Sequence, residues 1–413
     1  MSSSNKAKRE GRTLQMKLTI KQINRSFSNT VKVPHLLYEY INTPETLLLT
    51  FGKHSVSVSI ERGMNELEID EQVSTTLYIP FEVHSIQARY DERKNEIILG
   101  PIVALLTTEN HFANEIHHGT TPSFFKEMAR YCSQNGIYFY VLPVQPLDKQ
   151  QPLYGYRWMD DRWQKEIMPL PNVVYNRIPS YRQENNSEAT SLFQLLQQHN
   201  IAIFNERFLN KWEVYKAFIN DPVLAPHLPK TCIYEKASDL DTMLQNFATI
   251  NVKPVSGSLG RGVAKLSQTN DGMYTIHHSY QSEQQQTKHR LLSLLRAIIP
   301  LLKRQPYLIQ QGIQPLTYNR KAIDFRVLCN KNRFGEWSVT SIVGRCSAYE
   351  RIVSNIAMGG SLHRPEHILA THFQKHERIA ILQLLVKLAL QCAKTLEQHF
   401  EGTFGEFGVD LIV

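Results

Sequence analysis

A lysine followed closely by a glycine-rich segment is the feature of this 413-residue sequence that most clearly indicates chemistry. Lys253 ends a short apolar run, and Ser-Gly-Ser-Leu-Gly-Arg-Gly follows at residues 256–262. Because glycine has no Cβ, its backbone N–H groups can approach an anion closely. Lysine adds a positive charge that reaches phosphate oxygens. The loop residues that could contact phosphate are Ser256, Gly257, Ser258, Gly260 and Gly262.

The spacing of this loop leaves two interpretations open. It matches neither the G-x-x-x-x-G-K-[ST] pattern of a P-loop nor a G-x-G-x-x-G segment that opens a helix. A flexible flap over the phosphates of a nucleotide is one interpretation. An ordinary hairpin loop rich in glycine and serine is the other.

Further polar residues stand at the ends of later predicted strands. Arg326 belongs to an Asp-Phe-Arg segment, Arg345 closes the next strand, and Asn355 lies in a loop that ends Gly-Gly-Ser. Arginine neutralises phosphate oxygens, and asparagine in such a loop can orient them. Each residue alone is equally well explained as a surface ion pair or a turn residue. Their order after a lysine and a glycine loop favours a nucleotide site.

Composition excludes several classes of protein. Apolar and charged contents of 42% and 20% are typical of globular proteins. We find no apolar run near the roughly 18 to 20 residues of a membrane span and no secretory signal. Residues 1–25 hold seven basic residues and one acidic residue, which leaves only +2 of the total charge of +8 for the remainder. Specific nucleic-acid binding is therefore not expected, and a weak polyanion contact through the tail is a minor alternative.

Cysteine and histidine patterns give no catalytic or metal motif. The five cysteines are odd in number and lack C-x-x-C spacing, so we expect buried, reduced thiols in a reducing compartment. The pairs His363/His367 and His372/His376 have i,i+4 spacing but lack the glutamate of H-E-x-x-H. Solvated or core histidines explain them better than a metal site. Without a G-x-S-x-G segment, hydrolase chemistry is unsupported.

The pattern of short elements predicts three folded segments after a tail. Residues 1–16 read as a disordered basic tail, and 17–99 as a small antiparallel β-domain. The β-domain strands are expected at Thr46–Phe51, Ser55–Ile60, Thr75–Ile79, Ser85–Tyr90 and Glu96–Leu99. From Gly100 the order becomes strand, helix, strand, with a helix over Pro122–Gln134, which predicts an α/β domain to residue 204.

A third segment, 205–413, carries the candidate site. Its predicted elements are a helix over Lys211–Phe218, a helix capped by Ser238, a hairpin that returns through Val263–Leu266, an amphipathic core helix within Lys288–Arg304, strands at Tyr307–Gln311, Phe325–Asn330, Glu336–Gly344 and Gly408–Val413, and helix over most of Glu366–Phe400. The fold class is therefore α/β, with a small β-domain, a central α/β domain and the segment that holds the lysine loop.

These motifs together resemble a known family. Residues 205–413 are similar to an ATP-grasp domain, with Lys211 in its first lysine segment and Gln310-Gln311-Gly312-Ile313 at its interlobe hinge. From about Met16 the chain resembles the YheC/YheD endospore coat-associated family of the ATP-grasp superfamily. The segments that carry this closer resemblance are Leu99–Val103, Val174–Pro179, Phe204-Asn205 and Phe404–Leu411.

The resemblance implies an ATP-dependent carboxylate–amine ligase of the glutamate-ligase-like branch, with ATP and Mg²⁺ as cofactors and unidentified acid and amine substrates. Lys211 and Lys253 would then contact the α- and β-phosphates, and Arg326 and Arg345 the γ-phosphate or an acyl phosphate. Asp410 would hold Mg²⁺. Residues implied at the adenine and phosphates are Gln310, Gln311, Ile313 and Asn355, together with the loop residues above.

The resemblance also implies a cellular location, and it leaves an alternative function open. The expected location is the cytoplasm of the mother cell, with association with the spore coat and spore-coat proteins as candidate partners. The alternative is a structural, non-catalytic spore-coat-associated protein that keeps the ATP-grasp fold. The two differ in whether the C-terminal metal ligands are complete.

The end of the sequence bears on that difference. ATP-grasp enzymes hold magnesium between an acidic residue on one strand and a Glu-x-Asn segment on the next. Here Asp410 is present and the sequence ends at Val413. Glu406 shares the face of the strand but lies about 13 Å away at roughly 3.3 Å per residue. We therefore expect a shortened ATP-grasp domain with weak magnesium binding and little or no turnover.

Overall fold

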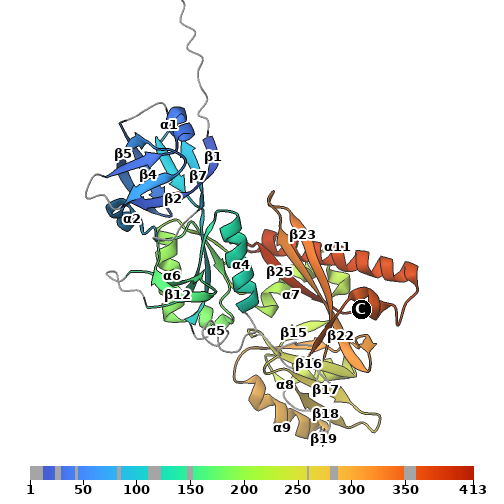
Figure 1. Cartoon of the computed structure of the whole chain (residues 1–413). Coiled ribbons are helices and arrows are strands. Elements are labelled where there is room, and N and C mark those ends of the chain that lie inside the picture. Colours follow the sequence, from blue (N-terminus) through green and yellow to red (C-terminus); the bar gives the residue numbers. More distant parts are fainter. Residues whose placement is uncertain are drawn as a thin grey trace, which may run out of the picture. The chain divides into compact units, whose positions relative to one another are not determined.

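The computed structural model describes most of the chain as two compact units, Met1–Phe204 and Asn205–Val413 (Figure 1). The residues that it describes are 13–23, 29–41, 45–80, 85–109, 122–146, 152–257, 260–279, 287–347 and 360–413. The site candidates Ser258 and Asn355, and residues 1–12 of the predicted tail, lie outside these ranges.

The first sheet of unit one holds eight strands from residues 13–99, drawn in blue and cyan in Figure 1. In sheet order they are β1 (Thr13–Leu18), β7 (Ile86–Asp91), β8 (Glu96–Leu99), β4 (Thr46–Phe51), β5 (His54–Arg62), β3 (Thr30–Val33), β6 (Leu67–Asp70) and β2 (Ile20–Ile23). Helix α1 spans His35–Ile41. The sheet is mixed rather than antiparallel, because β2–β6, β3–β5 and β4–β8 pair in parallel. Alternation in the sequence indicates which face of a strand is buried, not the direction of its partner.

Two predictions in this segment were wrong. Helix α2 (Glu71–Leu77) replaces the strand expected over Thr75–Ile79. Asp70 Oδ1 accepts the Val73 N–H at 2.7 Å as the N-cap, and Val73 and Leu77 are both buried at helical spacing. Residues 13–16, expected in the tail, belong to β1, which pairs antiparallel with β7.

The second sheet of unit one has a parallel centre. In order its strands are β12 (Arg162–Ile167), β11 (Tyr154–Met159), β10 (Tyr138–Val144), β9 (Ile102–Thr108), β13 (Val173–Asn176) and β14 (Ala202–Phe204). Its helices are α4 (Pro122–Gln134), α5 (Tyr181–Glu184) and α6 (Ser187–Gln198). The β11–β12 hairpin is an addition that the sequence reading missed. One hydrophobic core runs through both sheets, from Leu18 to Ile203. Independent folding of 17–99 and 100–204 stays a prediction.

The third sheet, in unit two, carries the lysine loop. Its order is β15 (Thr231–Ile233), β20 (Tyr307–Gln311), β16 (Thr249–Pro254), β17 (Ala264–Gln268), β18 (Tyr274–His278) and β19 (Thr287–His289). Helices α8 (Ala237–Asn246) and α9 (Leu291–Leu302) pack on it. Ser238 lies inside α8 and is not its cap; the Asp239 carboxylate accepts the N–H groups of Glu235 and Lys236 instead, each at 2.9 Å.

The fourth sheet forms the other part of unit two. Its order is β21 (Thr317–Tyr318), β22 (Lys321–Lys331), β23 (Trp337–Cys346) and β24 (Ser361–His363), with β25 (Glu406–Leu411) paired to the other side of β22. The helical elements here are α7 (Lys211–Ile219), a 3₁₀ turn at Ala225–His227, α10 (Pro365–Leu369) and α11 (Lys375–His399). A core that includes Phe325, Val327 and Leu385 lies between α11 and the sheet.

Helix α11 is the one helix in the described parts of the chain that is long and apolar enough to cross a membrane. Leu385, Ala389 and Ala393 on this helix are buried against the fourth sheet. Leu388 and Cys392 pack against Leu224, in a second small core. The burial of these side chains on two sides is typical of a core helix.

Candidate functional site

The glycine loop that joins β16 and β17 is held in a form that needs glycine. Gly260 and Gly262 have φ angles of +71° and +73°, in the left-handed region that side chains disfavour. A Cβ at Gly262 would lie 3.1 Å from both the Tyr307 hydroxyl and Pro254 Cγ. Ser279 Oγ donates to the Gly260 carbonyl at 2.7 Å. The described part of the loop is therefore anchored at its second half.

Lys211 ties this loop to helix α7. Asn210 caps the helix together with Glu213, so Lys211 occupies the first helical position. Its backbone N–H donates to Val255 O at 3.1 Å, and its Nζ donates to Pro254 O at 3.0 Å and Gly257 O at 2.8 Å. Burial, and then the charge of Lys253, lower the pKa of Lys211 to about 8. A cation thus lies against the first half of the loop.

Lys253 lies near the end of β16, half-buried, with its Nζ 2.6 Å from Gln310 Oε1 on the neighbouring strand. Gln310 Nε2 in turn donates to Thr231 Oγ1 at 3.0 Å, which fixes the orientation of the amide. Burial lowers the pKa of Lys253, and the negative charge of Asp410 opposes that effect. Asp410 of the fourth sheet is therefore near enough to interact with a lysine of the third.

The predicted hinge, Gln310 to Ile313, begins at this same glutamine. The N–H groups of Gln311 and Gly312 donate to Lys230 O and Thr249 O, each at 2.8 Å, and Gln311 Oε1 accepts the Lys230 N–H. These backbone donors belong to the sheet and are not available to a base. Ile313 comes after the last of these bonds and its side chain is 44% exposed. A nucleotide base could meet the backbone from Ile313 onward.

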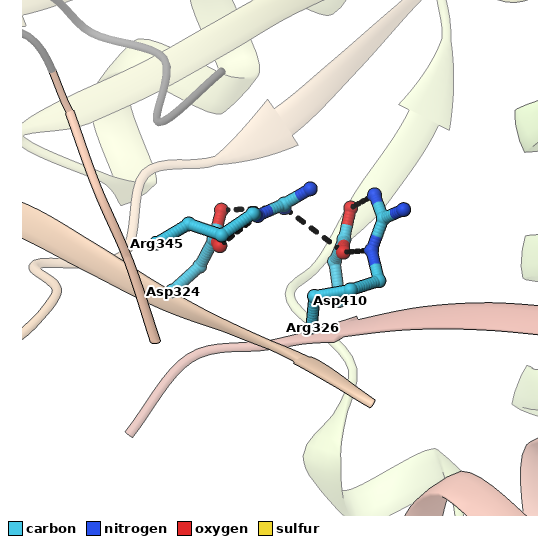
Figure 2. A network of polar contacts seen from close by, with 4 residues as sticks. All are labelled: Asp324, Arg326, Arg345 and Asp410. Atoms are coloured by element: carbon cyan, nitrogen blue, oxygen red, sulfur yellow. Dashed lines mark hydrogen bonds and ion pairs between the residues drawn. The ribbon is translucent and has the colours of Figure 1, made fainter. Parts of the chain in front are cut away.

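Two arginines and two aspartates form a continuous network across three strands of the fourth sheet (Figure 2). Asp324 on β22 lies opposite Arg345 on β23, and Arg326 on β22 lies opposite Asp410 on β25. Arg326 binds both oxygens of Asp410 through Nε and Nη2, the latter at 2.9 Å. Arg345 binds both oxygens of Asp324, at 2.6 and 2.9 Å.

Arg345 also joins the two halves of this network. Its Nη2 lies 2.9 Å from Asp324 Oδ2 and 2.9 Å from Asp410 Oδ1. Burial alone would lower the pKa of Arg345, but the two carboxylates outweigh burial and raise it. Arg345 and Asp324 are the less exposed members, with side chains 14% and 18% exposed, whereas Arg326 and Asp410 are 39% and 48% exposed.

The structure thus brings seven of the sequence-predicted residues into one network of contacts and charges. Lys211, Lys253, Gly257 and Gln310 are linked by hydrogen bonds or mutual repulsion, and Asp410 connects them to both arginines. Ile313 is exposed and Ser256 is half-buried. Sequence reasoning missed Asp324 and Thr231. The Asp-Phe-Arg spacing was the available signal for Asp324, because alternate residues share one face of a strand.

The donor set at Asp410 bears on magnesium. Among the described residues, there is no group of three or more His, Cys, Asp or Glu side chains that could hold a metal ion. The two carboxylates nevertheless flank a single cationic nitrogen of Arg345, as two oxygen ligands would flank a cation. Mg²⁺ takes one or two carboxylates plus phosphate oxygens in nucleotide sites. Asp324 and Asp410 therefore fit in donor type, at a position that a guanidinium now holds.

Comparison with known proteins adds the family. The sequence profile described as YheC/D-like ATP-grasp matches residues 200–413, more than half of the chain. The chain belongs to the YheC/D-like ATP-grasp family. This result, together with the mixed α/β architecture, confirms both the predicted fold class and the resemblance seen in the sequence.

Relatives of this YheC/D-like protein extend the match beyond the profile. It is 28% identical over 395 residues to the endospore coat-associated protein YheD of Bacillus subtilis (strain 168), which covers 94% of this chain and 85% of that protein. Among solved structures, the N5-carboxyaminoimidazole ribonucleotide synthetase of Thermotoga maritima is 12% identical, with a TM-score of 0.38 over 76% of this chain and 64% of that one. A D-cycloserine synthetase is 11% identical, with a TM-score of 0.38 over 75% and 86%.

Proposed function

We propose that unit two binds ATP between its third and fourth sheets. The observation that carries this proposal is the proximity of two partly buried ammonium groups. Lys211 donates to Pro254 O and Gly257 O, and Lys253 stands near the end of the strand that leads into the loop. Two like charges held together in a partly dry site are costly without an anion. The α- and β-phosphates of ATP supply that anion, and Gly257, Gly260 and Gly262 allow the backbone to approach it.

The rest of the site supports a carboxylate–amine ligase. Arg326 and Arg345 would bind the γ-phosphate, because each guanidinium can donate two hydrogen bonds to phosphate oxygens. A substrate carboxylate oxygen then attacks the γ-phosphorus, the bond to the bridging oxygen breaks, and ADP leaves. An amine nitrogen attacks the acyl carbon of the resulting acyl phosphate. Phosphate departs with the electron pair of the C–O bond, and the amine loses a proton to solvent or phosphate.

In this scheme the chain's own residues stabilise the negative charge of the phosphates and position the nucleotide. Arg345, which Asp324 orients, would hold the acyl phosphate as negative charge builds up on it. Gln310 fixes the position of the Lys253 ammonium, and backbone from Ile313 onward would hold the adenine. Asp410 would hold Mg²⁺. Such an ion would neutralise part of the charge of the phosphates.

Two measurements test this function in sequence. Calorimetric titration with Mg·ATP is expected to show saturable binding, and the thermal midpoint should rise with ligand concentration. ADP release is then followed with pooled carboxylic and amino acids, by omitting one class at a time. ATP binding without ADP release in any pool would retain the nucleotide site and reject the ligase. The absence of any ATP binding would reject both.

A second candidate is a protein that binds nucleotide and does not turn it over. The occupation of both Asp410 oxygens by arginine favours it, because a magnesium ligand is thereby engaged elsewhere. The name of the Bacillus subtilis relative suggests association with the endospore coat for this chain, with spore-coat proteins as partners. Fractionation of sporulating cells that produce the tagged chain tests that location: the tag is expected in mother-cell cytoplasm and in coat extracts.

A further inference from the structure

Asp410 occupies the position on the two arginines that an incoming phosphate would need. Both of its oxygens accept from Arg326, and Oδ1 also lies 2.9 Å from Arg345 Nη2. Figure 2 shows the carboxylate between the two guanidinium groups. With Asp324 on the other side of Arg345, two positive and two negative charges cancel locally. In this arrangement the arginines present no net charge to a ligand.

A glycine on β25 leaves room for the contact between Arg326 and Asp410. Gly408 precedes Asp410 by two residues and shares its face of the strand. A Cβ at Gly408 would lie 3.0 Å from Arg326 Nη1, 3.2 Å from its Cδ and 3.4 Å from its Cζ. The Arg326 side chain therefore passes close to the Gly408 backbone, through space that a Cβ would crowd, as it reaches Asp410. The pair is a defined arrangement of the strands and not a chance approach of two long side chains.

The two carboxylates of the network differ in how easily they can be displaced. Asp324 is 18% exposed and binds the 14% exposed Arg345, which lies opposite it on β23. Asp410 is 48% exposed. Exposed ion pairs contribute little net free energy, whereas buried pairs are costly to break. A phosphate group brings up to two charges and three oxygens. It would therefore replace Asp410 and leave Asp324 in place.

We propose that Asp410 is an internal anion that mimics the terminal phosphate in the empty site and is displaced from Arg326 and Arg345 when nucleotide binds. This inference rests on the proposed ATP site. The exchange frees both arginines for phosphate and the carboxylate for magnesium in one step. Asp410 therefore opposes binding of metal-free nucleotide and supports binding of the magnesium complex.

The test compares ATP affinity with and without magnesium, at one ionic strength, by calorimetry. Asp410→Asn keeps the size of the side chain and removes its charge. In EDTA, this variant should bind ATP about ten-fold more tightly than the unmodified chain, since no carboxylate competes for the arginines. With excess magnesium, the same variant should bind more weakly than the unmodified chain. A residue that serves only as a metal ligand would change affinity in magnesium alone.

Control variants identify the cause. Glu406→Gln removes the same charge from the same strand, and Glu406 binds the Asn330 amide at 3.2 Å. It should leave ATP affinity in EDTA nearly unchanged. The double variant Arg326→Met/Asp410→Asn should lose the gain, because the released arginine is absent. AMP, which has no γ-phosphate, should bind Asp410→Asn and the unmodified chain equally.

The outcomes separate this inference from the proposed function. ATP binding by the unmodified chain, with Asp410→Asn no tighter in EDTA, overturns the inference and leaves the nucleotide site intact. An equal gain in Glu406→Gln also overturns it, because general charge then explains the effect. No ATP binding by any variant under either condition overturns the proposed function and the inference together. Asp410→Ser, checked by circular dichroism, serves as a second variant if Asp410→Asn does not fold.

Discussion

Lys211 and Lys253 lie close enough for the charge of one ammonium to lower the pKa of the other. They come from different elements, the first turn of α7 and the end of β16. The Lys211 ammonium donates to two carbonyls of the loop region, and the Lys253 ammonium donates to Gln310. Each ammonium therefore has its own neutral acceptors, although the fold places the two charges near each other. Their protonation states and their separate contacts can each be tested.

ATP affinity should fall as pH rises through about 8. The pKa of Lys211 is lowered to about 8, so it is charged at pH 7 and mostly neutral at pH 9. A bound phosphate favours the charged form, so binding is linked to proton uptake above that pKa. The terminal phosphate of ATP is mostly ionised over this range, since the second pKa of a phosphate ester is about 6. Calorimetry from pH 7 to 9 should show affinity weaker by about ten-fold.

Lys211→Arg is the matched control for this pH effect, because arginine stays charged. Its affinity should change less between pH 7 and 9. Some dependence should remain, since burial lowers the pKa of Lys253 as well. An identical pH profile for the two proteins would contradict the assignment of the titration to Lys211.

Nucleotide affinity should depend on Lys253 and not on Lys230. Lys253→Ala removes a charge-assisted contact of roughly 1.5–3 kcal/mol, about ten- to a hundred-fold in affinity. Lys230 is exposed at the hinge, where its backbone rather than its ammonium pairs with Gln311. Lys230→Ala is the control and should bind ATP nearly as the unmodified chain does. Equal losses from both substitutions, measured by calorimetry, would argue against the loop as the phosphate site.

Gly262→Ala should weaken ATP binding more than Gly272→Ala does. The two glycines have φ angles of +73° and +76°, so alanine costs similar backbone strain at each, about 1 kcal/mol. Only at Gly262 does the new methyl meet neighbours, Tyr307 Oη and Pro254 Cγ at 3.1 Å. The loop must therefore shift at Gly262 alone. Thermal unfolding checks that strain is matched, and titration with Mg·ATP measures the difference in affinity.

Asp324→Asn should destabilise unit two more than Asp410→Asn. The half-buried Arg345 loses its closest carboxylate in the first variant. The expected cost is about 2–3 kcal/mol, below that of breaking a fully buried pair. Asp410 is half-exposed, so its removal should cost less than about 1 kcal/mol. Urea unfolding followed by tryptophan fluorescence compares the two. The opposite order would mean that Arg345 is held mainly by Asp410.

Sequence patterns were most reliable where the physical signal is local. Pro122 and the residues that follow predicted α4 at its observed bounds, because helical spacing and a proline at the first position are local features. The Lys253 loop was recognised for the same reason, since glycine content and a strand before it are visible in consecutive residues. Local signals failed at α2, where Asp70 caps a helix in a stretch whose β-branched residues favour strand.

The sequence by itself determined the residue types of the site, the lysine–glycine loop, the arginines at strand ends and the aspartate near the terminus. Only the tertiary structure decided how they pair. Asp410 and Arg326 are 84 residues apart, and their contact depends on the register of β22 against β25. Register arises from packing between distant strands, which no run of neighbouring residues encodes. That is why Asp410 was predicted as a metal ligand, while its pairing with two arginines, and the part of Asp324 in that network, emerged only from the fold.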